Sequence, residues 1–393
     1  MLDHPFKYAN SVIETIKHHG FSAYFVGGCV RDYLLNIEVN DIDIATSASP
    51  EEIKKIFPKV IPVGIDHGTV IVRYNHISYE VTTYKSDDSF TNKNSQISIK
   101  DDLSKRDFTI NALAMDDLGE IIDLFNGELD IKKKLIKTVG CPQDRFQEDP
   151  LRIIRALRFS SQFGFNIEEK TLQKMKSLKT TLSNLSIERI TKEMIKFFTG
   201  NNINQGLHYL LTTQIYTELP IFKNNQTLIN SLPKDIKPFT RFSEVISYFH
   251  LIDENISINQ WVKAWKASNL VKSETVNLVA SIKNYENNGM NVVLLYKLNR
   301  NLIQSFILVL NLYYHIEVKY EAILAEKNNL IIDSRKELAI DGNDITNLFP
   351  HLKKGKWIEE LMKEIEKEVL YKRLDNNKNT IKEWIKCNRL EIN

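Results

Sequence analysis

The apolar residues follow two different patterns along the chain. Up to about residue 140, short apolar runs rich in β-branched residues alternate with segments of helical spacing. From Arg145 onward, helical spacing predominates and almost no strand pattern remains. The first pattern is typical of a sheet packed against helices, and the second of helices packed on one another. We therefore predict an α+β protein, with a small N-terminal head on a mixed sheet and an elongated all-helical remainder.

The head is predicted to contain four strands and two helices. The strands are expected at 23–26, 41–45, 69–74 and 78–84. The helices are expected at 27–35 and 50–57. Asn75-His76 joins the last two strands as a hairpin turn, and Ser49-Pro50 is a helix-start signal.

The remainder of the chain is predicted to be helical. Three helices are expected at 150–163, 167–178 and 187–198, followed by a break at 199–202 and a helical block from about 203 to 318. A loop is predicted at 341–344, before a last helix. That helix has one apolar stripe, made of Trp357, Ile358, Leu361, Met362, Ile365 and Val369.

Composition limits the classes of function. The 52 Lys and Arg residues nearly balance 50 Asp and Glu residues, so a surface for nucleic acid must be a local patch. Cys29, Cys141 and Cys387 are far apart, which fits a reducing cytoplasm and no structural zinc site. The first residues lack a signal-peptide pattern, and no apolar run approaches the roughly 20 residues that span a bilayer. We expect a cytoplasmic protein without a membrane partner.

The pair Asp41 and Asp43 is the first candidate for chemistry. Alternate residues of a strand share a face, so the two carboxylates converge while Ile42 and Ile44 enter the core. Adjacent carboxylates repel unless a cation or proton lies between them, and oxygen ligands suit Mg²⁺. A solvated strand end has the same pattern, so the pair alone does not decide.

Neighbouring residues favour a phosphate-binding metal site. Gly27-Gly28 lies between a strand and a helix, where backbone N–H groups can hold a phosphate, and Arg31 lies one turn into that helix. A third acid, Glu80, lies on the predicted hairpin. Three acids beside a phosphate-binding turn are the components of a two-metal phosphoryl or nucleotidyl transfer site.

Several motifs together resemble one known family. GGCVRD, DIDIAT, YEVTTYK, KRDFTINALAM and EDPLRIIRALRF occur in this order over residues 22–198. They resemble the motifs of the class II tRNA nucleotidyltransferase and bacterial poly(A) polymerase family. LAIDGNDI, KWIEELMKEIE and IKEW resemble the C-terminal region of the CCA-adding enzymes of low-GC Gram-positive bacteria.

The resemblance implies a domain division and an activity. Residues 1–141 would be the catalytic head, 142–204 a neck for base recognition, 205–325 an RNA-binding body, and 326–393 a tRNA-binding tail. The implied activity is addition of CCA to the 3′ end of immature or damaged tRNA from CTP and ATP, with release of pyrophosphate. It implies no protein partner.

The resemblance also implies roles for individual residues. Asp41 and Asp43 would hold two Mg²⁺ ions, with Glu80 as the third catalytic acid. The expected nucleotide contacts are Gly27, Gly28, Arg31, Arg106, Asp149, Arg152, Arg155 and Arg158.

Base choice can be argued from Asp149 and Arg152. At positions i and i+3 of a helix start, they would share a face. A carboxylate acceptor beside a guanidinium donor is complementary to the pairing edges of cytosine and adenine, while uracil and guanine present the reverse pattern. Arg155 and Arg158 continue along the same predicted helix, where a solvated face is the alternative.

Other residues are expected to support the site. Asp107 and Asn111 would organise it, or cap and pack a helix. In the segment SIERITKEM, the charged residues would support base reading or form an exposed face. The same two readings, RNA contact or solvated face, apply to the lysines at 170, 174, 176 and 179.

The segment 85–100 departs from the family. It lacks the paired arginines usual there and is shorter, and Lys85 replaces a usual arginine. Shortening of this loop is associated with enzymes that add only CC, so CC addition is the alternative to full CCA addition. A poly(A) polymerase and a catalytically silent RNA-binding protein are further alternatives, which the C-terminal resemblance and the three intact acids disfavour.

Overall fold

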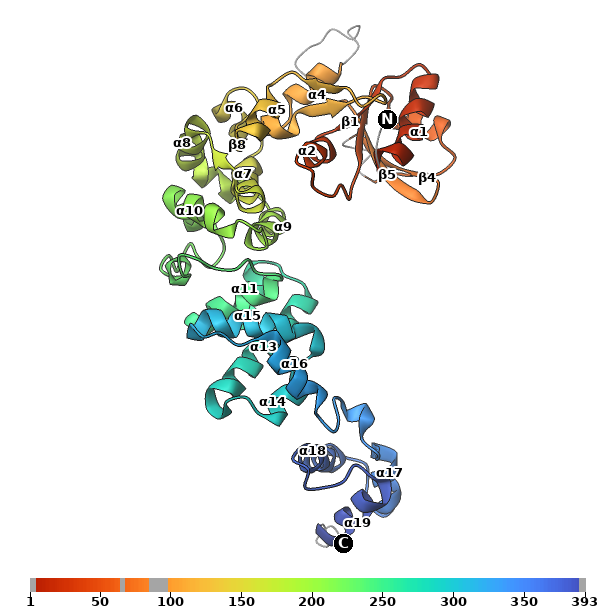
Figure 1. Ribbon diagram of the computed structural model, residues 1–393, viewed down its shortest axis with the longest axis vertical. Coiled ribbons are helices and arrows are strands. Elements are labelled where there is room, and N and C mark those ends of the chain that lie inside the picture. Colours follow the sequence, from red (N-terminus) through yellow and green to blue (C-terminus); the bar gives the residue numbers. More distant parts are fainter. Residues whose placement is uncertain (1–4, 64–67, 85–97, 389–393) are drawn as a thin grey trace. The chain divides into compact units, whose positions relative to one another are not determined.

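The computed structural model describes residues 5–63, 68–84 and 98–388, and the chain forms two compact units. The first unit is Met1–Asn224 and the second is Asn225–Asn393 (Figure 1). The first contains the whole sheet together with helices before and after it, and the second is helical. The predicted α+β class is therefore confirmed.

Within the described residues, one seven-stranded sheet forms the head, in the order β3-β4-β5-β2-β1-β6-β7. The strands are β1 Ala23–Val26, β2 Asp43–Thr46, β3 Val60–Ile61, β4 Thr69–Tyr74, β5 Ile77–Thr83, β6 Leu113–Met115 and β7 Ile121–Asp123. β2 pairs with β5 in parallel, whereas the other neighbours are antiparallel. The predicted mixed sheet is thus confirmed.

Helices cover this sheet, and α1 lies beside it in Figure 1. They are α1 Phe6–His18, α2 Gly28–Leu34, α3 Pro50–Ile56, α4 Ile99–Ser104 and α5 Gly127–Lys132. Ser49 caps α3 with Glu52 in a capping box, which is the physical basis of the predicted start. Asn75 and His76 have φ of 48° and 65°, which confirms the tight hairpin turn between β4 and β5.

One predicted strand begins later than expected. β2 starts at Asp43, so Asp41 precedes the strand instead of lying on it. The alternation of burial nevertheless extends back to Asp41, since Ile42 and Ile44 are buried and Asp41 is exposed. Ile42 and Ile44 are therefore buried as expected, although Asp41 lies outside the strand.

The rest of the first unit is a compact helical neck. Its helices are α6 Pro142–Glu148, α7 Leu151–Phe163, α8 Glu169–Leu178, α9 Ile187–Phe198 and α10 Ile203–Thr213. The break at 199–202 separates α9 from α10 as predicted. The strands β8 Leu135–Ile136 and β9 Asn166–Ile167, of two residues each, form a small parallel pair. The pattern of the sequence did not indicate these two strands. α7 packs against both α9 and α10.

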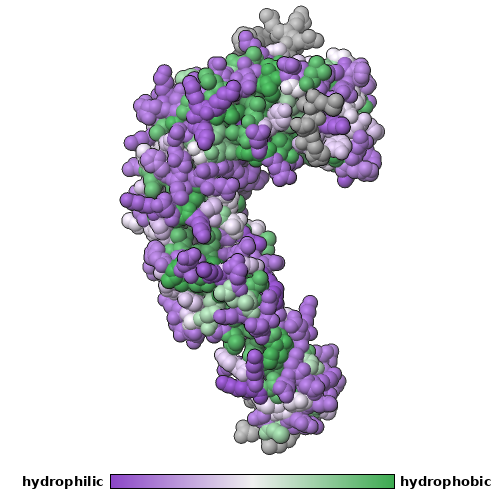
Figure 2. Space-filling model, in the orientation of Figure 1, coloured by the Kyte–Doolittle hydropathy of each residue, from purple (hydrophilic) through white to green (hydrophobic). Residues whose placement is uncertain are grey.

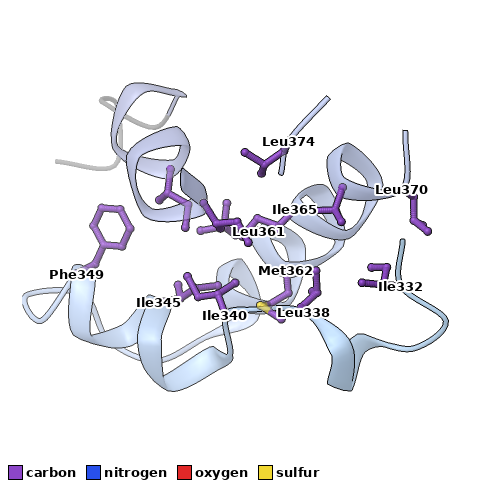
Figure 3. Packing of buried hydrophobic residues seen from close by; sticks show 13 residues of the cluster. Ile332, Leu338, Ile340, Ile345, Phe349, Leu361, Met362, Ile365, Leu370 and Leu374 are labelled. Atoms are coloured by element: carbon purple, nitrogen blue, oxygen red, sulfur yellow. The ribbon is translucent and has the colours of Figure 1, made fainter. Parts of the chain in front are cut away.

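The second unit is entirely helical within its described residues. Its helices are α11 Phe242–Ile252, α12 Ile258–Ala264, α13 Asn269–Asn288, α14 Val292–Lys297, α15 Ile303–Tyr314, α16 Tyr320–Asn328, α17 Gly342–Leu348, α18 Lys356–Leu370 and α19 Lys378–Asn388. In its C-terminal part, apolar residues of α17, α18 and α19 form a core, of which Figure 3 shows Ile345, Leu361 and Ile365.

Two sequence predictions in this part were wrong. Residues 341–344 are not a loop, because Asp341 caps α17 by accepting hydrogen bonds from the backbone N–H groups of Asn343 and Asp344. The Asp-Gly-Asn-Asp composition had suggested a turn, but an acidic residue is also a favoured helix cap. α18, with its predicted apolar stripe, is not the last helix, since α19 follows it.

The sequence predicted no membrane-spanning segment. In the view of Figure 2, hydrophilic residues dominate and apolar residues appear between them. Among the described residues, no helix is both long and apolar enough to cross a membrane.

The close packing of the neck gives a first testable prediction. A Cβ added at Gly200 would lie 2.3 Å from Ser161 Oγ and 2.5 Å from the Ser161 carbonyl oxygen. Because backbone must then move, we expect Gly200→Ala to lower the free energy of unfolding by about 1–3 kcal/mol. Chemical denaturation would measure this change. Gly342→Ala is the control, since its new Cβ would meet its nearest neighbour at 3.7 Å; equal losses in both variants would contradict the steric explanation.

Candidate active site

A cavity of about 690 Å³ lies in the first unit and is lined by head and neck residues. Ten of the eleven predicted site residues line it: Gly28, Arg31, Asp41, Asp43, Glu80, Arg106, Asp149, Arg152, Arg155 and Arg158. The first and last of these residues are more than 100 positions apart in the sequence, so the fold brings the set together. Their individual roles stay predictions.

The acids lie on the sheet at one side of this cavity. The parallel pairing of β2 with β5 places Asp43 directly opposite Glu80. Burial, together with the nearby charges of Glu80 and Asp41, raises the pKa of Asp43 to about 6, against a lowering effect of Arg106. Ionisation of Asp43 is therefore less favourable than that of an ordinary aspartate, and a nearby positive charge would offset this difference.

This electrostatic arrangement fits a divalent cation. Magnesium is commonly held by one or two carboxylates together with substrate phosphates, and does not need an all-protein cage. In the described part of the chain, no three His, Cys, Asp or Glu side chains form a ready metal-binding group. Asp41 and Asp43, with Glu80 beside them, are thus suited to share a metal with a ligand.

Gly27 is the one predicted residue that does not line the cavity. Its φ is 71°, and an added Cβ would lie 2.3 Å from Nη1 of Arg106. The guanidinium of Arg106 therefore occupies the space that a side chain would fill. Asp102 holds Arg106 from the other side, with a 3.1 Å ion pair. Gly27 shapes the site by making room for this arginine.

Arg31 is buried and held by neighbouring side chains. It donates to Asp32 Oδ1 at 2.7 Å and to Asn111 Oδ1 at 2.5 Å. Asn111 in turn donates to Asp107 Oδ1 at 2.9 Å. Asp107 and Asn111 thus organise the cavity wall, one of the two roles expected from the sequence.

The arginines of α7 pair with buried acids. Arg155 binds Asp107 Oδ2 at 2.6 Å, and Nε of Arg158 lies 2.7 Å from Glu193 of α9. Burial would raise the pKa of Asp107, but the charge of Arg155 and hydrogen bonds from Asn111 and Arg155 lower it below its ordinary range. Burial lowers the pKa of Arg158 to about 10, against the raising effect of Glu193. Arg155 and Arg158 are thus both ion-paired, and Arg158 is only 8% exposed, which disfavours the alternative of a solvated arginine face.

Asp149 and Arg152 both face the cavity, but not as predicted. Asp149 ends α6 with an extended backbone, and α7 begins only at Leu151, so the two residues do not share a helix face. The Pro150 between them favours an extended backbone at Asp149. The convergence of the two side chains on one cavity results from the turn between two helices.

Each base-reading candidate is held by other groups. Asp149 accepts hydrogen bonds from the Leu151 N–H at 3.1 Å and from Arg189 at 2.9 Å. Arg152 donates to Glu148 at 3.1 Å and to the Lys105 carbonyl oxygen at 2.8 Å. The segment SIERITKEM therefore supports these residues through Arg189 and the α7 arginines through Glu193.

Sequence reasoning missed several residues that line the cavity, among them Asp102, Lys105 and Lys196. The spacing of Asp102 and Arg106, four residues apart, was a usable signal for their ion pair. The lysines at 170, 174, 176 and 179 remain open between the two interpretations: Lys174 and Lys179 donate to Gln143 and Gln214, and the other two are exposed. The predicted short loop at 85–100 lies outside the described residues except for its last three positions.

Comparisons with known proteins match almost the whole chain. Residues 23–137 match the family described as the Poly A polymerase head domain. Residues 164–225 match a probable RNA- and SrmB-binding site of polymerase A, and residues 243–385 a putative second domain of tRNA nucleotidyltransferase.

Curated relatives decide the family. The CCA-adding enzyme of Oceanobacillus iheyensis is 45% identical over 100% of both chains, and that of Bacillus cytotoxicus is 38% identical over 98% of this chain and 99% of the relative. The chain belongs to the family of CCA-adding enzymes.

A solved member of this family has the same fold. The crystal structure of the Bacillus stearothermophilus CCA-adding enzyme in complex with CTP superposes with a TM-score of 0.86 at 32% identity, covering 100% of this chain and 99% of that one. Nucleotidyltransferases of this family generally depend on divalent metal ions.

The raised pKa of Asp43 predicts a pH-dependent effect on stability. When folding raises the pKa of a carboxyl group, the folded protein loses stability as the pH rises from the ordinary pKa of that group, near 3.8, to its pKa in the fold, about 6. We therefore expect Asp43→Asn, in the presence of a chelator, to melt above the wild type at pH 8 and level with it below about pH 4.

Thermal unfolding at several pH values would test this prediction. Asp41→Asn is the control, because this carboxylate is exposed and should change the melting temperature little. Added Mg²⁺ should raise the melting temperature of the wild type more than that of Asp43→Asn. A variant that melts with the wild type at every pH would show that Asp43 is not strained when ionised.

Proposed function

We propose that the chain adds CCA to the 3′ end of immature or damaged tRNA, using CTP and ATP and releasing pyrophosphate. The observation that carries this proposal is a single cavity that combines sheet carboxylates, buried arginines and the Asp149–Arg152 pair. Metal-binding acids, phosphate-binding arginines and a base-reading edge are the three parts that template-independent nucleotidyl transfer requires. The membership of the CCA-adding family supports the same reaction.

Asp149 and Arg152 would select the base. The contacts of Asp149 with Leu151 and Arg189 each use one lone pair of a different carboxylate oxygen, so acceptor sites remain. Arg152 uses three of its five N–H groups in the hydrogen bonds that the described residues make. An acceptor and a donor thus stay available for the amino group and ring nitrogen of cytosine or adenine, whereas uracil and guanine would meet like groups.

The arginines would hold the triphosphate. Arg31, Arg106, Arg155 and Arg158 line the cavity together with Gly28, the first residue of α2. Guanidinium groups bind phosphate oxygens with charge-assisted hydrogen bonds, which would also stabilise the pyrophosphate as it leaves. Their present acid partners keep them oriented until a nucleotide enters.

Asp41 and Asp43 would hold Mg²⁺. When bound, this metal lowers the pKa of a coordinated hydroxyl group and neutralises charge on the reacting phosphate. Glu80, opposite Asp43 on β5, would orient the attacking 3′-hydroxyl group. Asp43 and Glu80 lie on adjacent strands and Asp41 directly precedes one of them, so their positions should not change with the base that is read.

The remaining parts would bind RNA. We assign residues 205–325 and 326–393 to contacts with tRNA, as a body and a tail after a neck at 142–204 and a head at 1–141. RNA helices are recognised mainly by shape and phosphate position, which suits long helical surfaces. The three cysteines are free, as a cytoplasmic location would require.

An incorporation assay tests the proposed function. Purified enzyme with tRNA lacking its terminal CCA, Mg²⁺, CTP and ATP should extend each tRNA by two C and one A, and stop. The products would be resolved on a sequencing gel. Products that end at CC would instead favour the CC-adding activity suggested by the short segment 85–100, and long A tails would favour a poly(A) polymerase. Asp41→Ala should be inactive, and wild-type activity in this variant would exclude the metal role of Asp41.

Gly27 provides a second prediction. Gly27→Ala should raise the KM for CTP and ATP together by about tenfold, because the new methyl group displaces Arg106 and weakens one charged contact. Gly20→Ala is the matched control, since Gly20 also has positive φ, at 88°, but an added Cβ would meet nothing within 4 Å. Steady-state kinetics with both nucleotides would compare the variants. If the KM rises similarly in both variants, the cause is backbone strain and not the displacement of Arg106.

A further inference from the structure

Phe159, near the end of α7, is the most crowded aromatic residue of the site. Its side chain is only 2% exposed. The ring packs edge-on against Phe108 of the head at 5.8 Å and stacks on Phe163 at 5.8 Å with an interplanar angle of 12°. The ring is therefore fixed by neighbours from two parts of the first unit.

Three arginines lie around this one ring. The guanidinium carbon of Arg158 is 4.0 Å from the ring centroid, that of Arg31 is 5.3 Å away, and that of Arg155 is 5.4 Å away. Arg31 comes from the head and the other two from the neck. All three line the cavity.

Such a cluster needs something to hold it together. Like charges repel, and they do so more strongly where water is excluded. The face of an aromatic ring is negative and attracts cations within about 6 Å, most effectively in a desolvated site. The acids Asp107 and Glu193 contact Arg155 and Arg158 through their N–H groups, and the ring of Phe159 supplies a second contact to each of these arginines.

We propose that Phe159 is a positioning residue for phosphate binding, and that its ring is the shared platform on which Arg31, Arg155 and Arg158 are oriented toward the cavity. The proposal rests on the proposed function for the identity of the ligand, a nucleoside triphosphate. Phe159 acts through the arginines and not through the base.

The test is Phe159→Leu, which keeps an apolar side chain but removes the aromatic face. We expect the dissociation constant for CTP and the KM for CTP and ATP to rise about tenfold, because three cation–ring contacts are lost together. The value of kcat should change much less, and the preference for CTP over UTP should persist, since Asp149 and Arg152 are untouched. Calorimetry with CTP and Mg²⁺ and steady-state kinetics would measure these values.

Two neighbouring rings supply matched controls. Phe165 is as buried as Phe159, at 2%, and contacts Phe163, yet within the described residues no cation lies over its ring. Phe163 lies under Arg31 at 4.6 Å. The expected order of KM is therefore Phe159→Leu above Phe163→Leu, and Phe163→Leu above Phe165→Leu, which should match the wild type.

The outcomes separate the two proposals. Equal rises in Phe159→Leu and Phe165→Leu, or no rise in Phe159→Leu, would overturn the positioning role. If Phe159→Leu does not fold, which thermal unfolding would reveal, Phe163→Leu must still exceed Phe165→Leu or the inference fails. A wild-type chain that binds CTP but does not extend tRNA would overturn the proposed function alone. A wild-type chain that binds no CTP would overturn both.

Discussion

The site depends on the hydrogen bonds that the buried carboxylate of Asp107 accepts. One of its oxygens accepts from the Phe108 N–H and from Asn111, which also binds Arg31 of α2, and the other accepts from Arg155 of α7. A buried charge is stable only when it is paired and hydrogen-bonded, so the two helices must approach with their arginines aligned. Replacing this acid would remove the closest partner of Arg155 and the acceptor of Asn111, at a larger cost than the pairing itself contributes.

Acidic and basic side chains are equally numerous in the cavity, but they gather on different sides of it. Eight acidic and eight basic side chains line it. The carboxylates Asp41, Asp43 and Glu80 lie on the sheet side, and arginines dominate the α7 side. A ligand that carries both phosphates and a divalent cation is complementary to both sides, whereas a free phosphate or a free metal would satisfy only one. The raised pKa of Asp43 follows from the same separation, because burial and the neighbouring acids outweigh the lowering effect of Arg106.

The sequence predicted the strongly periodic elements well, but it missed other elements of the head, among them α1, β6 and β7, and it placed junctions poorly. Strong periodic patterns placed α9 at Ile187–Phe198 and β4 at Thr69–Tyr74, because burial on one face imposes the period directly. Asp149 was placed on a helix because spacing does not reveal where one helix ends and the next begins. The Asp107–Arg155 pair was equally hidden, since 48 positions separate the two residues and only the fold joins them. The motifs identified residues that line one cavity, while the partners of these residues required coordinates.

In the proposed reaction, the position of α7 would let one site read two bases. At 1.5 Å per residue, Arg152 and Arg158 lie about 9 Å apart along the helix axis, so one helix reaches both the base and the phosphates. Asp149, just before α7, and Arg152, in its first turn, would distinguish the bases, and Asp149 is held by Arg189, whose side chain is 50% exposed. Farther along the helix, Arg155 and Arg158 pair with Asp107 and Glu193. A change from cytosine to adenine would therefore need adjustment only at the start of α7, while the phosphate-binding part and the acids at the sheet would keep the geometry of transfer constant.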